Sequence, residues 1–182
     1  MPLEKWPVNS TRNIFSSRIV EINGRMSVNP RNGIENEYYI ADFPDWANII
    51  ALTPEKEIVL IKQYRHGTQK IEVEIPGGCV DPGEDPLDGA IRELEEETGY
   101  IGENPQYIGK VSPNPSFQSN YCHSILLENA RPGGMQKLDD GEDIEVFTAS
   151  LEDVENLIES GELSNSMVIA ALYLLKKNGL KP

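Results

Sequence analysis

The N-terminal quarter of the chain alternates between apolar and polar side chains, the period of β-strands. Residues 18–28 alternate around Asn23-Gly24, a dipeptide typical of a two-residue hairpin turn. Residues 37–40 form a further candidate strand. This pattern predicts a meander of short strands, and we assign residues 1–43 to an N-terminal β-strand extension.

Three more strand patterns follow the extension. Residues 46–52 and 57–62 are mostly apolar and flank the turn-forming residues 53–56, which predicts a second hairpin. Residues 71–75 alternate again and end at the segment Pro76-Gly77-Gly78. We therefore expect a sheet to begin near residue 44.

The period then changes to that of a helix over residues 86–98. The apolar residues that recur at helical spacing are Leu87, Ala90, Ile91 and Leu94. Asp85 is a suitable N-cap, Pro86 fits the first helical position and Gly99 fits the C-cap. Both ends of this helix are therefore predicted.

The remainder of the chain returns to strands and closes with helices. The predicted strands cover residues 107–111, 121–127 and 144–148, and the predicted helices cover residues 151–160 and 166–177. Strands that mostly precede helices, with one helix among them, favour an α+β fold or an α/β/α sandwich. Residues 44–182 are assigned to this second domain.

Composition and charge narrow the possible functions. The 182 residues include 16 Lys and Arg against 30 Asp and Glu, a formal net charge of −14, which disfavours nucleic-acid partners. The longest apolar run, residues 169–175, is too short to span a membrane. The start of the chain lacks the pattern of a secretory signal. Cys79 and Cys122 lack metal-binding spacing and suit a reducing compartment, so we expect a cytoplasmic protein.

The central helix carries an electrostatically unfavourable cluster of carboxylates. Glu93, Glu95, Glu96 and Glu97 crowd its last turns. A helix C-terminus favours cations by roughly 0.3–1 kcal/mol each. Like charges four residues apart also repel by roughly 0.2–0.5 kcal/mol. A solvated acidic face is one interpretation of this cluster.

A metal site is the other interpretation. Glu93, Glu96 and Glu97 lie three and four residues apart, so their carboxylates share one helix face. Such a set suits a hard divalent cation, Mg²⁺ or Mn²⁺. A main-chain carbonyl of the preceding Gly-Gly segment is a further candidate ligand, and Arg92 is placed to orient a carboxylate, with Glu84 as its expected partner.

These residues resemble the Nudix box, the pattern G-x5-E-x7-R-E-U-x-E-E-x-G-U. The matching positions are Gly78, Glu84, Arg92, Glu93, Leu94, Glu96, Glu97 and Gly99. The last apolar position of the pattern is Tyr100 here. So many fixed positions at set spacing make the resemblance specific.

The resemblance implies a Nudix α/β/α sandwich with a mixed sheet and a Mg²⁺-dependent pyrophosphohydrolase, with Mn²⁺ as a substitute. Glu93, Glu96 and Glu97 would bind the metal together with the carbonyl of Gly77, and Glu84–Arg92 would be a structural ion pair. Arg92 and Glu96 are also expected among the catalytic residues. The general base would come from the acidic loop 138–144, with Glu142 as first choice and Asp140 as second.

Segments outside the box resemble the branch of ADP-ribose pyrophosphatases and nucleoside diphosphate sugar hydrolases. These segments are residues 63–67, 74–78 and 112–115. Pro115 stands where that branch has a proline. The expected substrate contacts are Arg65, Trp46, Glu74 and Pro115. Arg65 is either a phosphate ligand or an ordinary surface residue, and Trp46 is either a nucleobase platform or a core residue.

The resemblance also implies a homodimer, in which the N-terminal extension pairs with a second subunit and helps to form the nucleoside side of the site. The favoured reaction converts ADP-ribose and related nucleoside diphosphate sugars to a nucleoside monophosphate and a sugar phosphate. Two alternatives stay open. One is a hydrolase that prefers another nucleotide sugar of the GDP-mannose type, and the other is a non-catalytic Nudix-fold sensor of nucleotide sugars.

Overall fold

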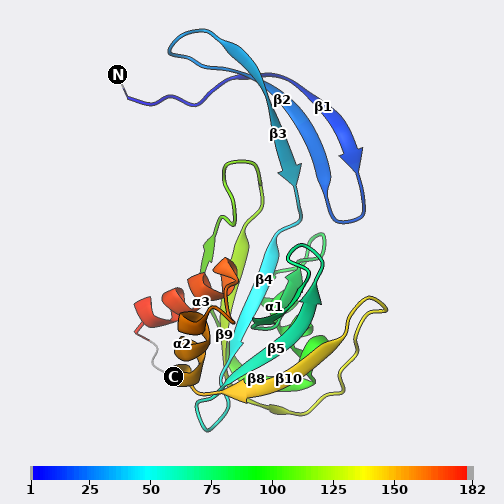
Figure 1. Cartoon of the computed structure of the whole chain (residues 1–182), viewed down its shortest axis with the longest axis vertical. Coiled ribbons are helices and arrows are strands. Elements are labelled where there is room, and N and C mark those ends of the chain that lie inside the picture. The colour runs from blue at the N-terminus through cyan, green and yellow to red at the C-terminus, as the bar shows by residue number, and fades with distance from the viewer. Residues whose placement is uncertain (1, 180–182) are drawn as a thin grey trace. The chain divides into compact units, whose positions relative to one another are not determined.

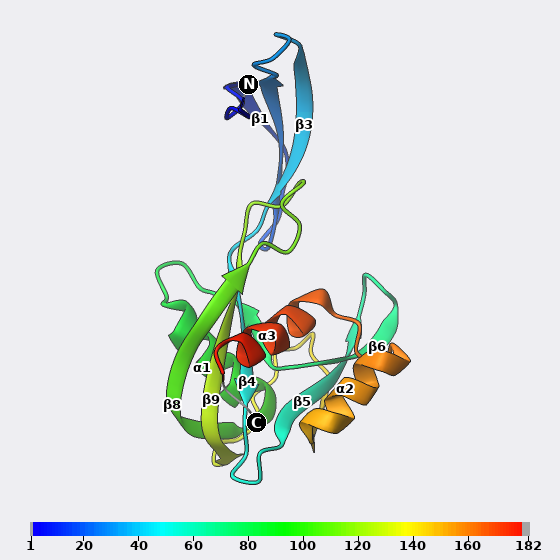
Figure 2. The same cartoon turned by 90° about the vertical axis from the view of Figure 1, so that its left-hand side faces the viewer.

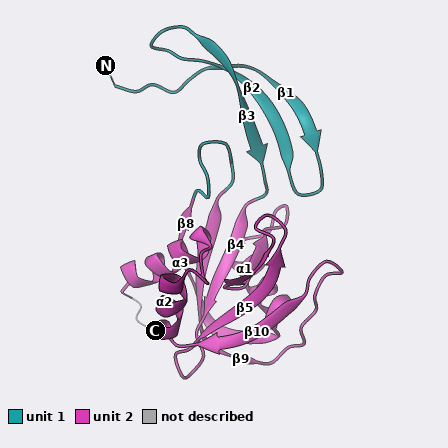
Figure 3. Cartoon of the chain, in the orientation of Figure 1, with its two compact units in different colours: residues 1–44, 112–120 teal, residues 45–111, 121–182 magenta. Residues whose placement is uncertain are grey.

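The computed structural model describes residues 2–179, which form two compact units (Figure 3). Unit 1 comprises residues 1–44 and 112–120, and unit 2 comprises residues 45–111 and 121–182. The N-terminal extension thus forms most of unit 1. The segment 112–120 joins it because the backbone of Ala41 hydrogen-bonds to Phe117 over 2.7 Å and to Ser119 over 3.3 Å.

Unit 1 is a three-stranded antiparallel sheet in the order β1-β2-β3 (Figure 1). The strands are β1 (Val8–Ser16), β2 (Glu21–Val28) and β3 (Glu35–Asp42). This arrangement confirms the predicted meander. Every residue of β1 is exposed, so the sheet buries little apolar surface of its own.

The hairpin turn predicted at Asn23-Gly24 is wrong. Gly24 lies in the middle of β2 and pairs with Arg12 on one side and Tyr39 on the other. A side chain at this position would run into the carboxylate of Glu37, which accepts a hydrogen bond from Arg12 over 2.7 Å. The glycine therefore makes room for a cross-strand ion pair and does not form a turn.

Unit 2 contains two sheets. The four-stranded sheet has the order β7-β4-β9-β8, and the three-stranded sheet has the order β10-β5-β6. The strands are β4 (Trp46–Ala51), β5 (Ile58–Arg65), β6 (Lys70–Glu74), β7 (Gly77–Cys79), β8 (Tyr100–Val111), β9 (Cys122–Pro132) and β10 (Ile144–Ala149). Strands β4 and β9 are parallel, and the remaining pairs are antiparallel, so the sheet is mixed.

The second predicted hairpin is only half right. The turn forms, because the amide of Thr53 donates to the carbonyl of Glu57 over 2.9 Å. Beyond the single bridge of Leu52 to Ile58, however, β4 and β5 separate into different sheets. Both strands are buried near this turn. The two faces of β4 pack in two different hydrophobic cores, and each core includes residues of a helix.

Three helices complete unit 2 as an α/β/α arrangement (Figures 1 and 2). They are α1 (Pro86–Thr98), α2 (Leu151–Ser160) and α3 (Ser166–Lys177), with the predicted bounds. Ala47, Ile49 and Ala51 of β4 pack in the core that contains α1, while Ile50 packs in the core of α2 and α3. The expected α+β sandwich is confirmed.

The ends of α1 follow from its local sequence. The side chain of Asp85 accepts a hydrogen bond from the amide of Leu87 over 2.9 Å. Gly99 takes the left-handed conformation, φ 69°, and its amide bonds to the carbonyl of Glu95 over 2.8 Å. These caps set the position of every side chain on the helix. In the part of the chain that the structure describes, no helix has the length and apolar character needed to cross a membrane.

Candidate active site

The carboxylates of α1 differ in burial because they lie at different angles around the helix. Glu97 shares the inner face with Leu94 and is 3% exposed. The side chain of Glu93 is 15% exposed and that of Glu96 is 43% exposed. Glu95 points to solvent. The three residues predicted to bind metal therefore run from the interior to the surface, which a purely solvated face would not do.

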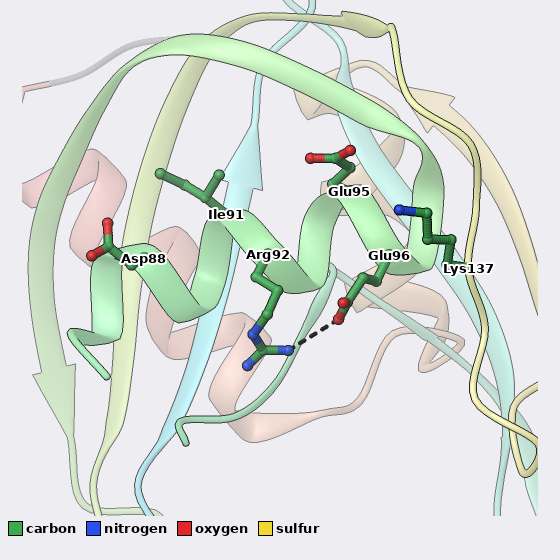
Figure 4. Close-up of a pocket in the computed structure, with 6 residues that line it drawn as sticks. All are labelled: Asp88, Ile91, Arg92, Glu95, Glu96 and Lys137. Carbon is green, nitrogen blue, oxygen red and sulfur yellow. Dashed lines mark hydrogen bonds and ion pairs between the residues drawn. The ribbon is translucent and has the colours of Figure 1, made fainter. Parts of the chain in front are cut away.

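Arg92 holds this cluster together. Its guanidinium donates to both carboxylate oxygens of Glu84, over 3.0 and 3.1 Å, which confirms the predicted ion pair. The same group donates to Glu93 over 2.8 Å and to Glu96 over 3.0 Å, the latter contact drawn in Figure 4. A further bond reaches the carbonyl of Cys79 over 3.2 Å. The hydrogen bonds that Arg92 donates to Glu84 raise the pKa of Arg92 and keep it charged.

The Gly77-Gly78 segment passes directly against two of these carboxylates. The amide of Gly77 donates to Oε2 of Glu97 over 2.9 Å. A Cβ atom on Gly78 would lie 2.6 Å from the carboxylate of Glu93 and would force it to move, so glycine lets this carboxylate lie directly against the backbone. The backbone and the carboxylates thus share one small space, as predicted from the sequence.

Burial and repulsion shape the electrostatics of this space. Burial, together with the charges of Glu93 and Glu142, raises the pKa of Glu97 to about 8 against the lowering effect of the Gly77 amide. Burial also raises the pKa of Glu93, which Arg92 opposes. The cluster therefore needs positive charge to hold all of its carboxylates ionised.

The acidic loop reaches the same cluster. Glu142 acts electrostatically on Arg65, Glu93 and Glu97, and it lies, like Asp140, on the exposed part of the loop. The loop is closed by a turn in which the amide of Asp139 donates to the Glu142 carboxylate over 3.0 Å. The charge of Glu142 thus acts on the cluster, and its role as the general base stays a prediction.

Gln136, which the sequence analysis missed, ties this loop to the helix. Its side-chain amide donates to the backbone carbonyl of Glu97 over 2.7 Å and to that of Ile144 over 3.3 Å. The amide of Lys137 adds a bond to the carbonyl of Glu96 over 2.7 Å. The open carbonyls of a helix C-terminus are thus satisfied by the loop. A lone glutamine in a polar loop gives no signal of this role.

A hollow of about 290 Å³ lies along the outer side of α1 (Figure 4). It is lined by Asp88, Ile91, Arg92, Glu95, Glu96 and Lys137. Of the predicted site residues, only Arg92 and Glu96 reach it. Its lining includes neither Glu97 nor the glycine segment, so it is not the centre of the site.

Arg65 and Glu74 were predicted as separate substrate contacts, and the structure joins them. Two N–H groups of Arg65 donate to the Glu74 carboxylate over 3.0 and 2.6 Å. The side chain of Glu74 is 6% exposed, whereas that of Arg65 is 44% exposed. The hydrogen bonds that Arg65 donates to Glu74 raise the pKa of Arg65. The guanidinium is therefore held in place with its other N–H groups open to a ligand.

A cavity of about 590 Å³ adjoins this pair. Its lining includes Trp46, Arg65, Glu74 and the Gly77–Cys79 strand, together with residues 164–167 at the start of α3. The predicted contacts Trp46, Arg65 and Glu74 thus share one cavity. Pro115 belongs to unit 1, in the segment 112–120, and its role stays a prediction.

The residues fit a hard divalent cation by their donor chemistry. Carboxylate oxygens and a close backbone segment are the donors that Mg²⁺ and Mn²⁺ prefer. Between residues 2 and 179, no group of three or more His, Cys, Asp or Glu side chains is arranged so that it could hold a metal ion. Arg92 explains this, because one of its nitrogens bonds to both Glu93 and Glu96. Glu97, buried and close to two other carboxylates, is the residue that a cation would stabilise most.

Comparison with known proteins agrees with this site. The family described as "NUDIX domain" matches residues 43–172. The chain is 33% identical to an ADP-ribose pyrophosphatase of Bacillus subtilis (strain 168), covering 92% of this chain and 91% of the relative. It is also 33% identical to a methanol dehydrogenase activator of Bacillus methanolicus, with coverages of 94% and 93%.

The fold also matches a solved structure. A crystal structure of ADP compounds hydrolase superposes with a TM-score of 0.85 over 100% of both chains, at 23% identity. The match of the family over most of the chain includes the whole α1 carboxylate cluster and its glycine segment. This chain therefore belongs to the NUDIX domain family.

Proposed function

We propose that this chain hydrolyses the pyrophosphate bond of nucleoside diphosphate sugars, with ADP-ribose favoured, to a nucleoside monophosphate and a sugar phosphate. The observation that supports it most is the approach of the Glu93 and Glu97 carboxylates to one backbone segment, Gly77-Gly78, which lines the same cavity as Arg65. The name of the Bacillus subtilis relative, ADP-ribose pyrophosphatase, supports the choice of substrate.

Glu93, Glu96 and Glu97, with the carbonyl of Gly77, would hold Mg²⁺ or, as a substitute, Mn²⁺. When bound, the cation neutralises charge on the phosphate oxygens and makes water a better nucleophile. The Gly77 amide keeps one oxygen of Glu97 fixed and leaves the other for the cation. Arg92 would lose some of its hydrogen bonds to Glu93 and Glu96 when the cation binds. Its ion pair with Glu84 would keep α1 fixed to the preceding loop.

Glu142 would accept the proton of the attacking water. It lies on an exposed loop, and its charge raises the pKa of Glu93 and Glu97. The same charge would act on a water held near those carboxylates. Asp140 is the second candidate for this role. A carboxylate on a loop that is anchored at Gln136 can approach the substrate without unfolding the helix.

Arg65 would bind the diphosphate, because two of its N–H groups are used by Glu74 and the others face the cavity. Glu74 contributes by orienting Arg65. Trp46 lines the same cavity and offers an aromatic face to a ring of the substrate.

Two alternatives differ in what they predict. A hydrolase that prefers another nucleotide sugar, such as one of the GDP-mannose type, would use the same carboxylates with a different base or sugar. A non-catalytic sensor would bind nucleotide sugars without cleaving them. Retention of Glu93, Glu96 and Glu97 around the Gly77-Gly78 segment favours catalysis over sensing.

We further propose a cytoplasmic homodimer formed through unit 1. Large apolar side chains stand exposed on its sheet, among them Val8, Ile14, Phe15 and Tyr39. An exposed strand such as β1 also offers an unpaired edge to a second copy. The cysteine content fits a reducing compartment.

The test is to incubate the pure protein with Mg²⁺ and a panel of nucleoside diphosphate sugars and to separate the products. The proposal expects AMP and ribose 5-phosphate from ADP-ribose, abolished by EDTA. Fastest cleavage of a GDP-sugar would support the first alternative. Saturable binding without cleavage of any compound would support the sensor and contradict the proposed function.

A further inference from the structure

A buried asparagine lies beside the substrate cavity and has an unsatisfied acceptor. Asn48 sits on β4 between Ala47 and Ile49, within an otherwise apolar run, and is 7% exposed. Alternation along β4 places it on the α2–α3 side, since Ala47 and Ile49 pack on the α1 side. The sequence analysis did not single it out.

The amide of Asn48 can satisfy only half of its hydrogen-bonding groups. Its Nδ2 donates to the backbone carbonyl of Met167, at the start of α3, over 3.4 Å. Its Oδ1 is buried and has no hydrogen-bond partner among the described residues. Rotating the amide by 180° would place Oδ1 against the Met167 carbonyl, two acceptors face to face. In the observed orientation, Asn48 Oδ1 is therefore a buried acceptor to which a ligand could donate a hydrogen bond.

A small recess lies at this point. It has a volume of about 60 Å³, and its lining includes Trp46, Asn48, Gly77, Gly78 and Met167. A water needs roughly 10–15 Å³ of such space, so the recess admits a group of the size of a hydroxyl or hydroxymethyl.

The surroundings favour a ligand rich in donors. The larger cavity, which shares Trp46, Arg65 and the glycine segment with the recess, is also lined by Glu72, a carboxylate in a residue that is 8% exposed. Asn48 and Glu72 both offer acceptors. A polyhydroxylated ring supplies several donors at once, and Trp46 offers it an apolar face.

The recess also lies at the right place along the substrate. Gly77 and Gly78 line it, and the same two residues contact Glu97 and Glu93. The Gly77-Gly78 segment therefore lies between a group in the recess and the carboxylates of Glu93 and Glu97. Arg65, the proposed diphosphate ligand, lines it as well.

We propose that a hydroxyl group of the nucleoside diphosphate sugar's sugar enters this recess from the larger cavity and that Asn48 Oδ1 accepts a hydrogen bond from it. This inference rests on the proposed function and adds to it the residue that selects the sugar. A hydroxyl satisfies an acceptor that is otherwise buried alone, so compounds without the hydroxyl are disfavoured.

The test measures binding by calorimetry in EDTA, so that no cleavage occurs, for ADP-ribose and for the methyl ester of ADP, which lacks the sugar. Asn48→Ala is compared with Asn156→Ala, a matched change at an exposed asparagine on α2. We expect Asn48→Ala to weaken ADP-ribose binding by roughly three- to tenfold and to leave the methyl ester within about twofold. Asn156→Ala should change neither affinity.

Asn48→Leu, which fills the space without an acceptor, repeats the test if the alanine variant does not fold. Equal weakening of both ligands would overturn the inference in favour of a structural role, and unchanged affinities would assign Oδ1 to a bound water. Either result leaves the proposed function standing if the wild type cleaves ADP-ribose in Mg²⁺. A wild type that neither binds nor cleaves these compounds would overturn both proposals.

Discussion

The amide of Gly77 donates a hydrogen bond to Oε2 of Glu97 over 2.9 Å. This bond joins the short strand β7 to the last turn of α1 and fixes one oxygen of the most buried carboxylate in the cluster. Because that carboxylate has little solvent around it, its stability depends on the charges nearby. Several predictions depend on this arrangement.

The first prediction concerns stability with and without a divalent cation. Wild-type protein should gain about 5–10 °C in melting temperature when Mg²⁺ is present at about 100 times its dissociation constant. Glu97→Gln should lose most of this gain. Without metal, the same variant should be at least as stable as the wild type, because a neutral amide can still accept from Gly77 without the cost of burying a charge.

The matched control is Glu95→Gln, an exposed carboxylate on the same helix. It should keep the full stabilisation by Mg²⁺. Thermal denaturation followed by circular dichroism measures both effects. If Glu97→Gln kept the same gain in melting temperature as Glu95→Gln, the assignment of Glu97 to the metal would be wrong.

The second prediction concerns Arg92. A lysine cannot make its five hydrogen bonds to three carboxylates and a carbonyl at once. Arg92→Lys should therefore lower the free energy of unfolding by about 1–2 kcal/mol, given that the group is partly exposed. Urea denaturation measures this loss.

Arg131→Lys serves as the control for Arg92. Arg131 pairs with Glu103 at 3.6 Å, and both side chains are more than half exposed. Its replacement should change the unfolding free energy by less than about 0.5 kcal/mol. Equal effects of the two substitutions would show that the Arg92 network adds no stability beyond a surface pair.

The third prediction separates the two candidate bases. Glu142→Gln should lower kcat by roughly 10²–10⁴ with little change in KM, because the group acts on a proton and not on substrate binding. Asp140→Asn should keep most of the activity, since Glu142 is the loop carboxylate whose charge raises the pKa of Glu93 and Glu97. Steady-state kinetics with ADP-ribose tests both. A larger loss with Asp140→Asn would reverse the assignment.

The fourth prediction concerns the oligomeric state. Wild-type protein should sediment as a dimer at micromolar concentration, and Phe15→Asp should shift it toward the monomer, because Phe15 is 54% exposed on β1. Asn156→Asp, at an exposed position on α2 of unit 2, should leave the dimer intact. Sedimentation velocity distinguishes the species. A wild type that is monomeric throughout would contradict a dimer through unit 1.

Elements defined by local chemistry could be predicted from the sequence. The bounds of α1 follow from Asp85, Pro86 and Gly99, whose effects reach only a few residues. The pair of Glu84 and Arg92 also follows from the spacing of the box. The two hairpins could not be predicted in this way. Gly24 is required by its contact with Glu37 on the neighbouring strand. After the turn at residues 53–56, β4 pairs with β9 and not with β5.

Contacts between distant segments could not be predicted. The side chain of Gln136 hydrogen-bonds to the Glu97 carbonyl at the end of α1, although strands β8 and β9 separate the two residues in the sequence. The polar residue within the apolar run 46–52 was visible in the sequence, but nothing local shows that Asn48 faces Met167, 119 positions away. Arg65 and Glu74 were both expected at the site, whereas their bond to each other appears only once β5 and β6 pair.

The most direct test of the account is AMP release from ADP-ribose in Mg²⁺, measured side by side for the wild type, Glu95→Gln and Glu97→Gln. We expect the wild type and Glu95→Gln to turn over at similar rates and Glu97→Gln to be slower by roughly 10²–10³. Full activity of a folded Glu97→Gln variant would contradict a metal-dependent hydrolase centred on the carboxylates of α1.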